Sequence, residues 1–141
     1  MVGLVVAAHG RLAQELVATA EQIMGKLANV ATVSIEPGTP AEAIRTQMRA
    51  AVKELDHGDG VLVLADLFGG TPCKESLLLC QKENLEVLAG VNLPMLLKAA
   101  SLRGENIPLH DLAQALLTYA QRNIRFASEL VRDAAARHAA S

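Results

Sequence analysis

Two residues of the chain could do chemistry together, although they lie far apart in the sequence. His9 directly follows the apolar run Val2–Ala8, and Asp66 directly follows the apolar run Val61–Ala65. A neutral imidazole has one donor and one acceptor nitrogen, so a carboxylate that holds Nδ1–H leaves Nε2 free as a nucleophile. The pair would suit transfer of a chemical group through His9, provided that the fold brings the two side chains together.

The residues beside this pair indicate which group is transferred. Gly69-Gly70-Thr71-Pro72 predicts a turn into a helix with proline in its first turn. The free N–H groups and the positive dipole end of such a helix form an anion site. Gly10 removes side-chain bulk beside the imidazole. We therefore predict phosphoryl transfer through a phosphohistidine, with Gly10, Arg11, Gly69, Gly70 and Thr71 as candidate phosphate-binding residues.

Each of these residues also has a purely structural explanation. His9 could be a hydrogen-bonded histidine at a strand end, and Asp66 could cap a loop. Thr71 is an adequate N-cap without any function. Arg11 is as easily a surface residue of a helix as a phosphate ligand. The functional interpretation depends on His9, Asp66 and the glycines meeting at one place.

Four short runs of strand-forming residues organise the chain. They are Val2–Ala8, Val30–Ile35, Val61–Ala65 and Glu86–Val91, and they recur about every 30 residues, as in strand–helix–strand units. Three of the runs are almost continuously apolar rather than alternating. Such strands are covered on both faces, which is typical of a parallel sheet between two helical layers.

The intervening segments carry helical patterns. Leu12, Leu16, Ala20, Ile23 and Leu27 predict one apolar helix face, and Thr39-Pro40-Ala41-Glu42 predicts a capping box at the start of the next helix. Further helices are expected from Thr71, from about Asn92 and from Pro108.

These patterns together predict an α/β fold, an open, doubly wound and mainly parallel sheet with helices on both faces and strand order 2-1-3-4. That order places His9 and Asp66 at the point where the strand order reverses, which is where ligands bind in such sheets. Asn123–Ala127 fits either a fifth edge strand or continued helix. We expect one domain over residues 1–128 and a helical or frayed tail over residues 129–141.

Composition and charge exclude several classes of protein. The chain has 141 residues, 51% of them hydrophobic, and a net charge of −2. Without a run of basic residues it suits neither nucleic acid nor a polybasic membrane anchor. Its apolar runs are too short to cross a membrane, and Val2–Ala8 lacks the basic flank of a signal peptide. We expect a cytoplasmic protein without direct membrane insertion.

No residue pattern predicts a metal ion or a cofactor. Histidines 57, 110 and 138 are expected in a turn, near a helix start and in the tail, so none of them completes a metal-ligand cluster. Gly58-Asp59-Gly60 precedes a strand instead of following one, so it predicts a turn and not a nucleotide-binding loop. Since no nucleotide motif is present, the phosphoryl donor is expected to be another phosphoprotein.

Three segments of the chain look like the three signatures of the mannose-family enzyme IIA of the bacterial sugar phosphotransferase system. They are Val5–Ala13, Asp66–Pro72 and Gly90–Met95, and the resemblance covers residues 1–128. It implies that His9 is phosphorylated and that Asp66 orients it. It also implies a histidine-containing phosphocarrier protein as donor, an enzyme IIB as acceptor, and a homodimer that exchanges a terminal fifth strand.

Alternatives from other classes remain open on the sequence alone. A regulatory module would carry the same phosphohistidine and signal through its phosphorylation state without sugar uptake. The phosphoryl donors of dihydroxyacetone kinases share this fold too. A strand that ends in His-Gly-Arg also resembles the start of the small tetrapyrrole metal chelatases, but these need a second histidine from a later strand end, and the sequence offers none there.

Overall fold

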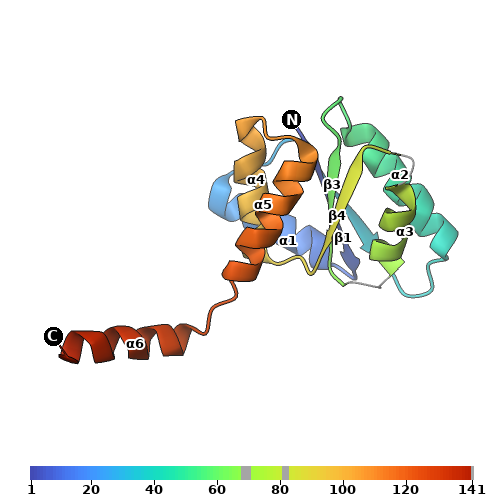
Figure 1. Ribbon diagram of the computed structural model, residues 1–141. Coiled ribbons are helices and arrows are strands. Elements are labelled where there is room, and N and C mark those ends of the chain that lie inside the picture. The colour runs from blue at the N-terminus through green and yellow to red at the C-terminus, as the bar shows by residue number, and fades with distance from the viewer. Residues whose placement is uncertain (68–70, 81–82, 141) are drawn as a thin grey trace.

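The computed structural model describes residues 1–67, 71–80 and 83–140, apart from the side chains of residues 71–73 (Figure 1). Within these residues a sheet lies between two layers of helices. The elements are β1 (Gly3–His9), α1 (Leu12–Met24), β2 (Val30–Ile35), α2 (Ala41–Leu55), β3 (Val61–Ala65), α3 (Thr71–Leu79), β4 (Leu85–Ala89), α4 (Leu93–Leu102), the short 3₁₀ helix η1 (Arg103–Glu105), α5 (Leu109–Arg122) and α6 (Ala127–Ala140).

The sheet is parallel throughout and has the order β2-β1-β3-β4. In the register of the central strands, Ala7 of β1 lies opposite Val33 of β2 and Ala65 of β3. The predicted fold class and strand order are therefore confirmed. Because β1 and β3 are neighbours, the residues that end them, His9 and Asp66, emerge side by side at the carboxyl edge of the sheet.

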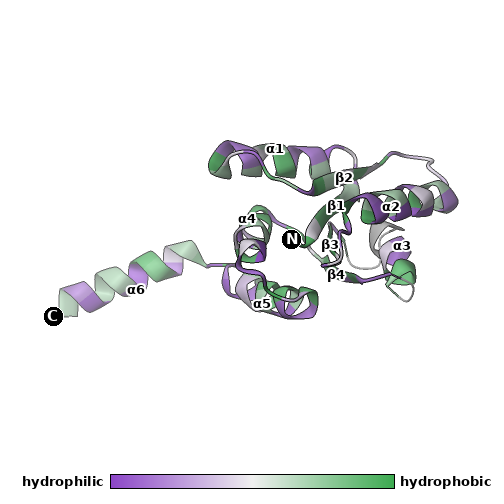
Figure 2. Ribbon diagram, turned by 90° about the horizontal axis from the view of Figure 1, so that it is seen from above, coloured by the Kyte–Doolittle hydropathy of each residue, from purple (hydrophilic) through white to green (hydrophobic). Residues whose placement is uncertain are grey.

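Both faces of the sheet are buried. From β1, Leu4 and Val6 pack toward α1, α4 and α5, whereas Val5 and Ala7 pack toward α2 and α3. Figure 2 shows these two groups of helices on opposite sides of the strands. Strands covered on both sides need apolar residues at every position, which explains the continuous apolar runs of the sequence.

Two predicted elements differ from the structure, the last strand in its bounds and the first helix in its buried face. The last strand spans Leu85–Ala89 and not Glu86–Val91. Gly90 has a φ of 89° and so turns the chain out of the strand, a conformation that glycine adopts without strain. In α1 the buried face is built on Ala13 and Ala20, whereas Leu12 and Ile23 of the predicted face are 46% and 60% exposed.

The capping box predicted at Thr39 is wrong. Pro40 is the N-cap of α2 and makes no side-chain hydrogen bond to the helix. The Thr39 hydroxyl instead donates to the carbonyl of Glu36 at 2.8 Å. It closes a turn before the helix, because a threonine hydroxyl can serve either a turn or a cap.

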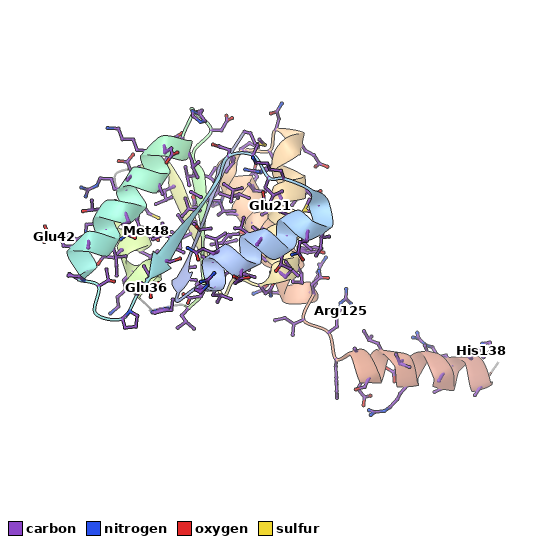
Figure 3. All side chains as sticks on the ribbon, turned by 180° about the vertical axis from the view of Figure 1, so that it is seen from behind. Glu21, Glu36, Glu42, Met48, Arg125 and His138 are labelled. Atoms are coloured by element: carbon purple, nitrogen blue, oxygen red, sulfur yellow. The ribbon has the colours of Figure 1, made fainter. Side chains whose placement is uncertain are left out.

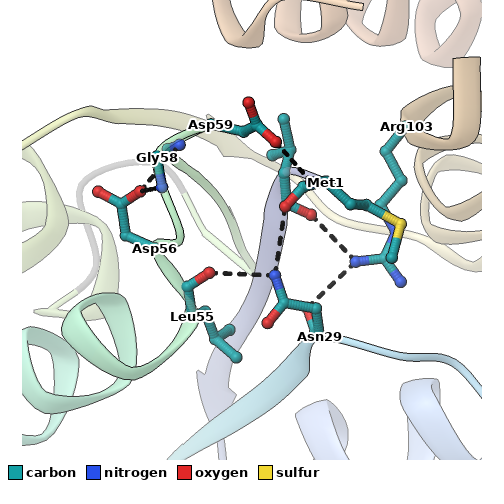
Figure 4. A network of polar contacts seen from close by, with 9 residues as sticks. Met1, Asn29, Leu55, Asp56, Gly58, Asp59 and Arg103 are labelled. Atoms are coloured by element: carbon teal, nitrogen blue, oxygen red, sulfur yellow. Dashed lines mark hydrogen bonds and ion pairs between the residues drawn. The ribbon is translucent and has the colours of Figure 1, made fainter. Parts of the chain in front are cut away.

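A polar network joins the elements at the amino edge of the sheet (Figure 4). The guanidinium of Arg103, which is 4% exposed, donates to the carbonyls of Val2 and Asn29 at 3.1 Å each and to that of Ala28. The Asn29 side chain donates in turn to the carbonyl of Leu55 at 3.0 Å. Arg103 thus ties the end of α4 to the starts of β1 and β2.

The carboxyl-terminal segment extends away from the sheet. Residues 124–126 are neither strand nor helix in this single chain, and α6 buries none of its residues. Figure 3 shows Arg125 and His138 on this projecting segment. Of the two alternatives for residues 123–127, the fifth edge strand is not seen in this single chain. No helix of the described residues is long and apolar enough to cross a membrane.

Candidate functional site

His9 and Asp66 meet at the carboxyl edge of the sheet. The Nδ1 atom of His9 lies 2.9 Å from Oδ2 of Asp66, and the backbone N–H of His9 donates to the same oxygen at 3.0 Å. The side chain of His9 is 48% exposed, whereas that of Asp66 is 10% exposed. The histidine is therefore open to a partner while the carboxylate beneath it is shielded.

The carboxylate of Asp66 is held in its charged form. Partial burial works against ionisation, but hydrogen bonds from the backbone and ring of His9, together with the N–H of Leu67 on Oδ1, outweigh it and lower the pKa of Asp66. A charged carboxylate accepts hydrogen bonds and donates none, so the Nδ1 atom facing it is the protonated nitrogen. The Nε2 atom then carries the free lone pair.

The geometry suits a nucleophilic histidine. A fixed tautomer leaves the lone pair on Nε2, and attack through Nε2 places positive charge on the ring beside a carboxylate that stabilises it. The same carboxylate oxygen also binds the backbone of His9, which restrains both groups. The two predicted catalytic residues are therefore in contact, and their catalytic roles stay a prediction.

Gly10 follows His9 and owes its identity to its backbone conformation. It has a φ of 60°, and an added Cβ would meet nothing within 4 Å apart from the two neighbouring residues, so the lack of bulk beside the ring of His9 stays a prediction. Its N–H donates to the carbonyl of Ile35 at 3.0 Å. The left-handed turn lets the chain leave β1 and enter α1 within two residues.

Arg11 lies beside the site but points along α1. Its guanidinium is 3.6 Å from the carboxylate of Glu15, one turn further on, and its side chain is 79% exposed. The structure pairs it with Glu15 and not with Asp66. A long exposed arginine keeps its freedom to turn, so its role toward phosphate stays a prediction.

The remaining candidate phosphate ligands follow Asp66. Gly69 and Gly70 lie outside the described residues, and so does the side chain of Thr71. α3 begins at Thr71, as the sequence predicts, so a helix N-terminus follows β3, and its use as an anion site stays a prediction. The three residues stay predicted ligands.

The third sequence signature has a structural explanation. Asn92 is the N-cap of α4, and its side chain accepts a hydrogen bond from the N–H of Met95 at 2.9 Å. Pro94 stands in the first turn of the same helix, where a missing N–H costs nothing. This signature therefore builds a helix start and brings no further side chain to His9.

Sequence reasoning missed an ion pair behind the site. Arg45 of α2 donates from Nε to Oε2 of Glu75 in α3 at 2.7 Å. Glu75 is 5% exposed. The two residues lie on different helices, so no local spacing could have indicated the contact.

The described residues contain no group of three or more His, Cys, Asp or Glu side chains that could hold a metal ion. His57, His110 and His138 are exposed. A cavity of about 320 Å³ lies at the amino edge of the sheet, against Arg103, at the end opposite His9. The Nη1 group of Arg103 already donates to the backbone carbonyls of Val2 and Asn29.

Comparisons with known proteins identify the family of the chain. Residues 3–117 match the family model EIIA-man, described as "PTS system fructose IIA component". The chain is 36% identical over 112 residues to the mannose-specific EIIAB component of Escherichia coli K12, which covers 79% of this chain and 35% of that protein. The chain thus spans about a third of that relative. It is also 30% identical to the fructose-specific EIIA component of Bacillus subtilis, over 92% of this chain and 88% of the relative.

Solved structures share the fold. The mannose/sorbose-specific IIA subunit of Enterococcus faecalis aligns with a TM-score of 0.79 at 34% identity, over 88% of this chain and 92% of its own. The EIIA component of Streptococcus agalactiae aligns with a TM-score of 0.83 at 27% identity, over 92% and 99%. With a His–Asp pair at the strand ends and a family match over most of its length, the chain belongs to the mannose-type enzyme IIA components of the phosphotransferase system, PTS.

Proposed function

We propose that this chain is a phosphoryl carrier of the sugar PTS that works through a phosphohistidine at His9. The observation that carries the proposal is the 2.9 Å contact between Nδ1 of His9 and Asp66, which leaves Nε2 outward on a half-exposed ring. The donor is the histidine-containing phosphocarrier protein, and the acceptor is an enzyme IIB. Membership of the IIA family supports this order of transfer.

In the transfer step the lone pair of Nε2 attacks the phosphorus of the donor phosphohistidine. The P–N bond of the donor breaks, and its imidazole nitrogen takes the electron pair. The ring of His9 becomes positive, with its Nδ1–H held by the ionised Asp66. Gly10, Arg11, Gly69, Gly70 and Thr71 are the proposed ligands of the phosphoryl oxygens. Transfer to IIB reverses the same steps.

The proposal is tested with purified enzyme I, the phosphocarrier protein and labelled phosphoenolpyruvate. We expect one acid-labile, base-stable phosphoryl group per chain, lost in His9→Ala and kept in His110→Ala, whose exposed histidine lies on α5. Passage of the label to an enzyme IIB would support the transport role over a purely regulatory one. Label retained by His9→Ala would contradict the assignment.

We further propose that the protein works as a homodimer in the cytoplasm. Four large apolar side chains are exposed in or just before α6: Ile124, Phe126, Leu130 and Val131, with exposures of 78%, 70%, 50% and 69%. Apolar side chains gathered on one short segment favour burial against a partner. Sedimentation velocity at micromolar concentration is expected to show a dimer, and a monomer would remove this part of the proposal.

A further inference from the structure

The helix α3, which follows β3, has few buried apolar side chains among those that the structure describes. Among the described side chains of α3, Leu79 is 2% exposed, whereas Leu77 and Leu78 are 46% and 51% exposed. A nine-residue helix derives most of its stability from tertiary packing. Contacts other than apolar burial must therefore contribute to the position of α3.

One polar contact of α3 is made by the Glu75 carboxylate. Only 7% of its side chain is exposed, and Nε of Arg45 lies 2.7 Å from Oε2. A buried carboxylate without a partner is strongly destabilising, so Arg45 is what makes this residue tolerable at that position. α2 and α3 pack side by side (Figure 1), and this ion pair joins them.

The ion pair lies in the half of the fold that carries the site. Arg45 is in the second turn of α2, which follows β2, and Glu75 is in the second turn of α3, which follows β3. In parallel strand–helix units, helices begin at the carboxyl edge of the sheet. The pair therefore braces the N-terminal turns of two helices at the edge where His9 and Asp66 meet.

We propose that Arg45 is a positioning residue for phosphoryl transfer at His9. By holding Glu75 it fixes α3, so that the N–H groups at the start of this helix face the phosphoryl group in a constant geometry. It also neutralises a carboxylate that would otherwise repel that group from the second turn of the same helix. The inference rests on the proposed function, because it requires that His9 be phosphorylated.

The test compares three variants of the full chain with wild type. Arg45→Ala removes the ion pair, and Arg45→Lys keeps the charge. Arg49→Ala is the matched control, an exposed arginine one turn further along α2. Phosphorylation is followed with phosphoramidate as a small donor and with the phosphocarrier protein as a large one. Amide hydrogen exchange of α3 and α4 is measured without any donor.

For Arg45→Ala we expect labelling about tenfold slower with both donors, since small misplacements of a catalytic group cost this much or more. The loss should fall on kcat, while KM for the phosphocarrier protein stays within about twofold. Arg45→Lys should recover most of the rate, and Arg49→Ala should match wild type. Exchange should rise in α3 and stay unchanged in α4.

Each other outcome has a distinct meaning. Wild-type labelling in Arg45→Ala overturns the positioning role, and so does unchanged exchange in α3, because Arg45 would then not hold the helix. A rate in Arg45→Lys as low as in Arg45→Ala would show that charge neutralisation is not part of the role. If the wild type accepts no phosphoryl group from either donor, the proposed function itself fails.

Discussion

The carboxylate of Asp66 contacts both the backbone and the ring of His9. Its Oδ2 atom accepts from the backbone N–H of His9 at 3.0 Å and faces Nδ1 of the ring at 2.9 Å. The first contact is structural, and the second fixes the tautomer. Asparagine could keep the first through its carbonyl oxygen, but it carries no charge to stabilise a positive ring.

We expect Asp66→Asn to slow phosphorylation of His9 about 10²–10³-fold without unfolding the chain. The charge beside the developing imidazolium is lost, and the amide can donate to Nδ1 and hold the wrong tautomer. Rapid-mixing phosphotransfer on the folded variant measures this loss. Asp111→Asn, an exposed carboxylate in the first turn of α5, serves as the control. A rate within about threefold of wild type would mean that Asp66 is only a cap.

We expect the Asp66 carboxylate to make the unfolding free energy of the protein depend on pH in the acid range. Its pKa is lowered in the folded state from the usual 3.8, so the unfolded chain binds its proton more readily. The stabilisation is present above pH 3.8 and is lost as the pH falls through the lower folded pKa. Urea titrations of wild type and Asp66→Asn across this range should show the difference between the two shrinking toward acid. A constant difference would contradict the shift.

Among the elements, the amino edge of the sheet depends on one buried arginine. Burial lowers the pKa of the Arg103 guanidinium, which nevertheless stays charged. It donates to three carbonyls, those of Val2, Ala28 and Asn29. Those carbonyls belong to segments that enter β1 and β2. Arg103 therefore holds together the segments that lead into β1 and β2 at the amino edge of the sheet.

Arg103→Met should cost about 3 kcal/mol of unfolding free energy, because it removes three hydrogen bonds from a charged donor, one of them buried. Equilibrium urea unfolding measures the loss, and Arg122→Met, on an exposed arginine at the end of α5, is expected to change it by less than about 0.5 kcal/mol. A loss below about 1 kcal/mol in Arg103→Met would show that water replaces the guanidinium.

Elements with a strong apolar pattern could be predicted from the sequence, and polar contacts between elements could not. β2 and β3 begin and end as predicted. For β3 the reason is a continuous apolar run, which specifies a strand covered on both faces. The Thr39 cap failed because its hydroxyl has a local competitor in the Glu36 carbonyl. The Arg45–Glu75 pair had no local signal at all, since it joins α2 to α3.

The site followed from topology more than from motifs. Strand order 2-1-3-4 makes β1 and β3 neighbours, so His9 and Asp66 had to meet once that order was predicted. Arg11 was harder, because an exposed side chain has several rotamers, and here it pairs with Glu15. Gly69 and Gly70 lie outside the described residues, so their part in phosphate binding stays a prediction.

At the scale of the whole molecule, α6 contributes no buried residue to the described domain. A chain that ends at Ser128 should accept phosphate at His9 as well as the full chain does, but it should dimerise less tightly because it lacks the exposed Leu130 and Val131. An isolated helix of 14 residues is marginal in water. Sedimentation velocity and phosphotransfer on the shortened chain check this division of the chain, and slower labelling of His9 would contradict it.

The central claim is that Asp66 holds Nδ1 of His9 so that Nε2 carries the phosphoryl group. Nitrogen and phosphorus NMR of the ¹⁵N-labelled, phosphorylated protein tests it most directly, because the two phosphohistidine isomers give different ring nitrogen shifts and couplings. The account predicts phosphorus bonded to Nε2 of His9 and a proton retained on Nδ1. Phosphorus on Nδ1, or on any residue other than His9, would contradict it.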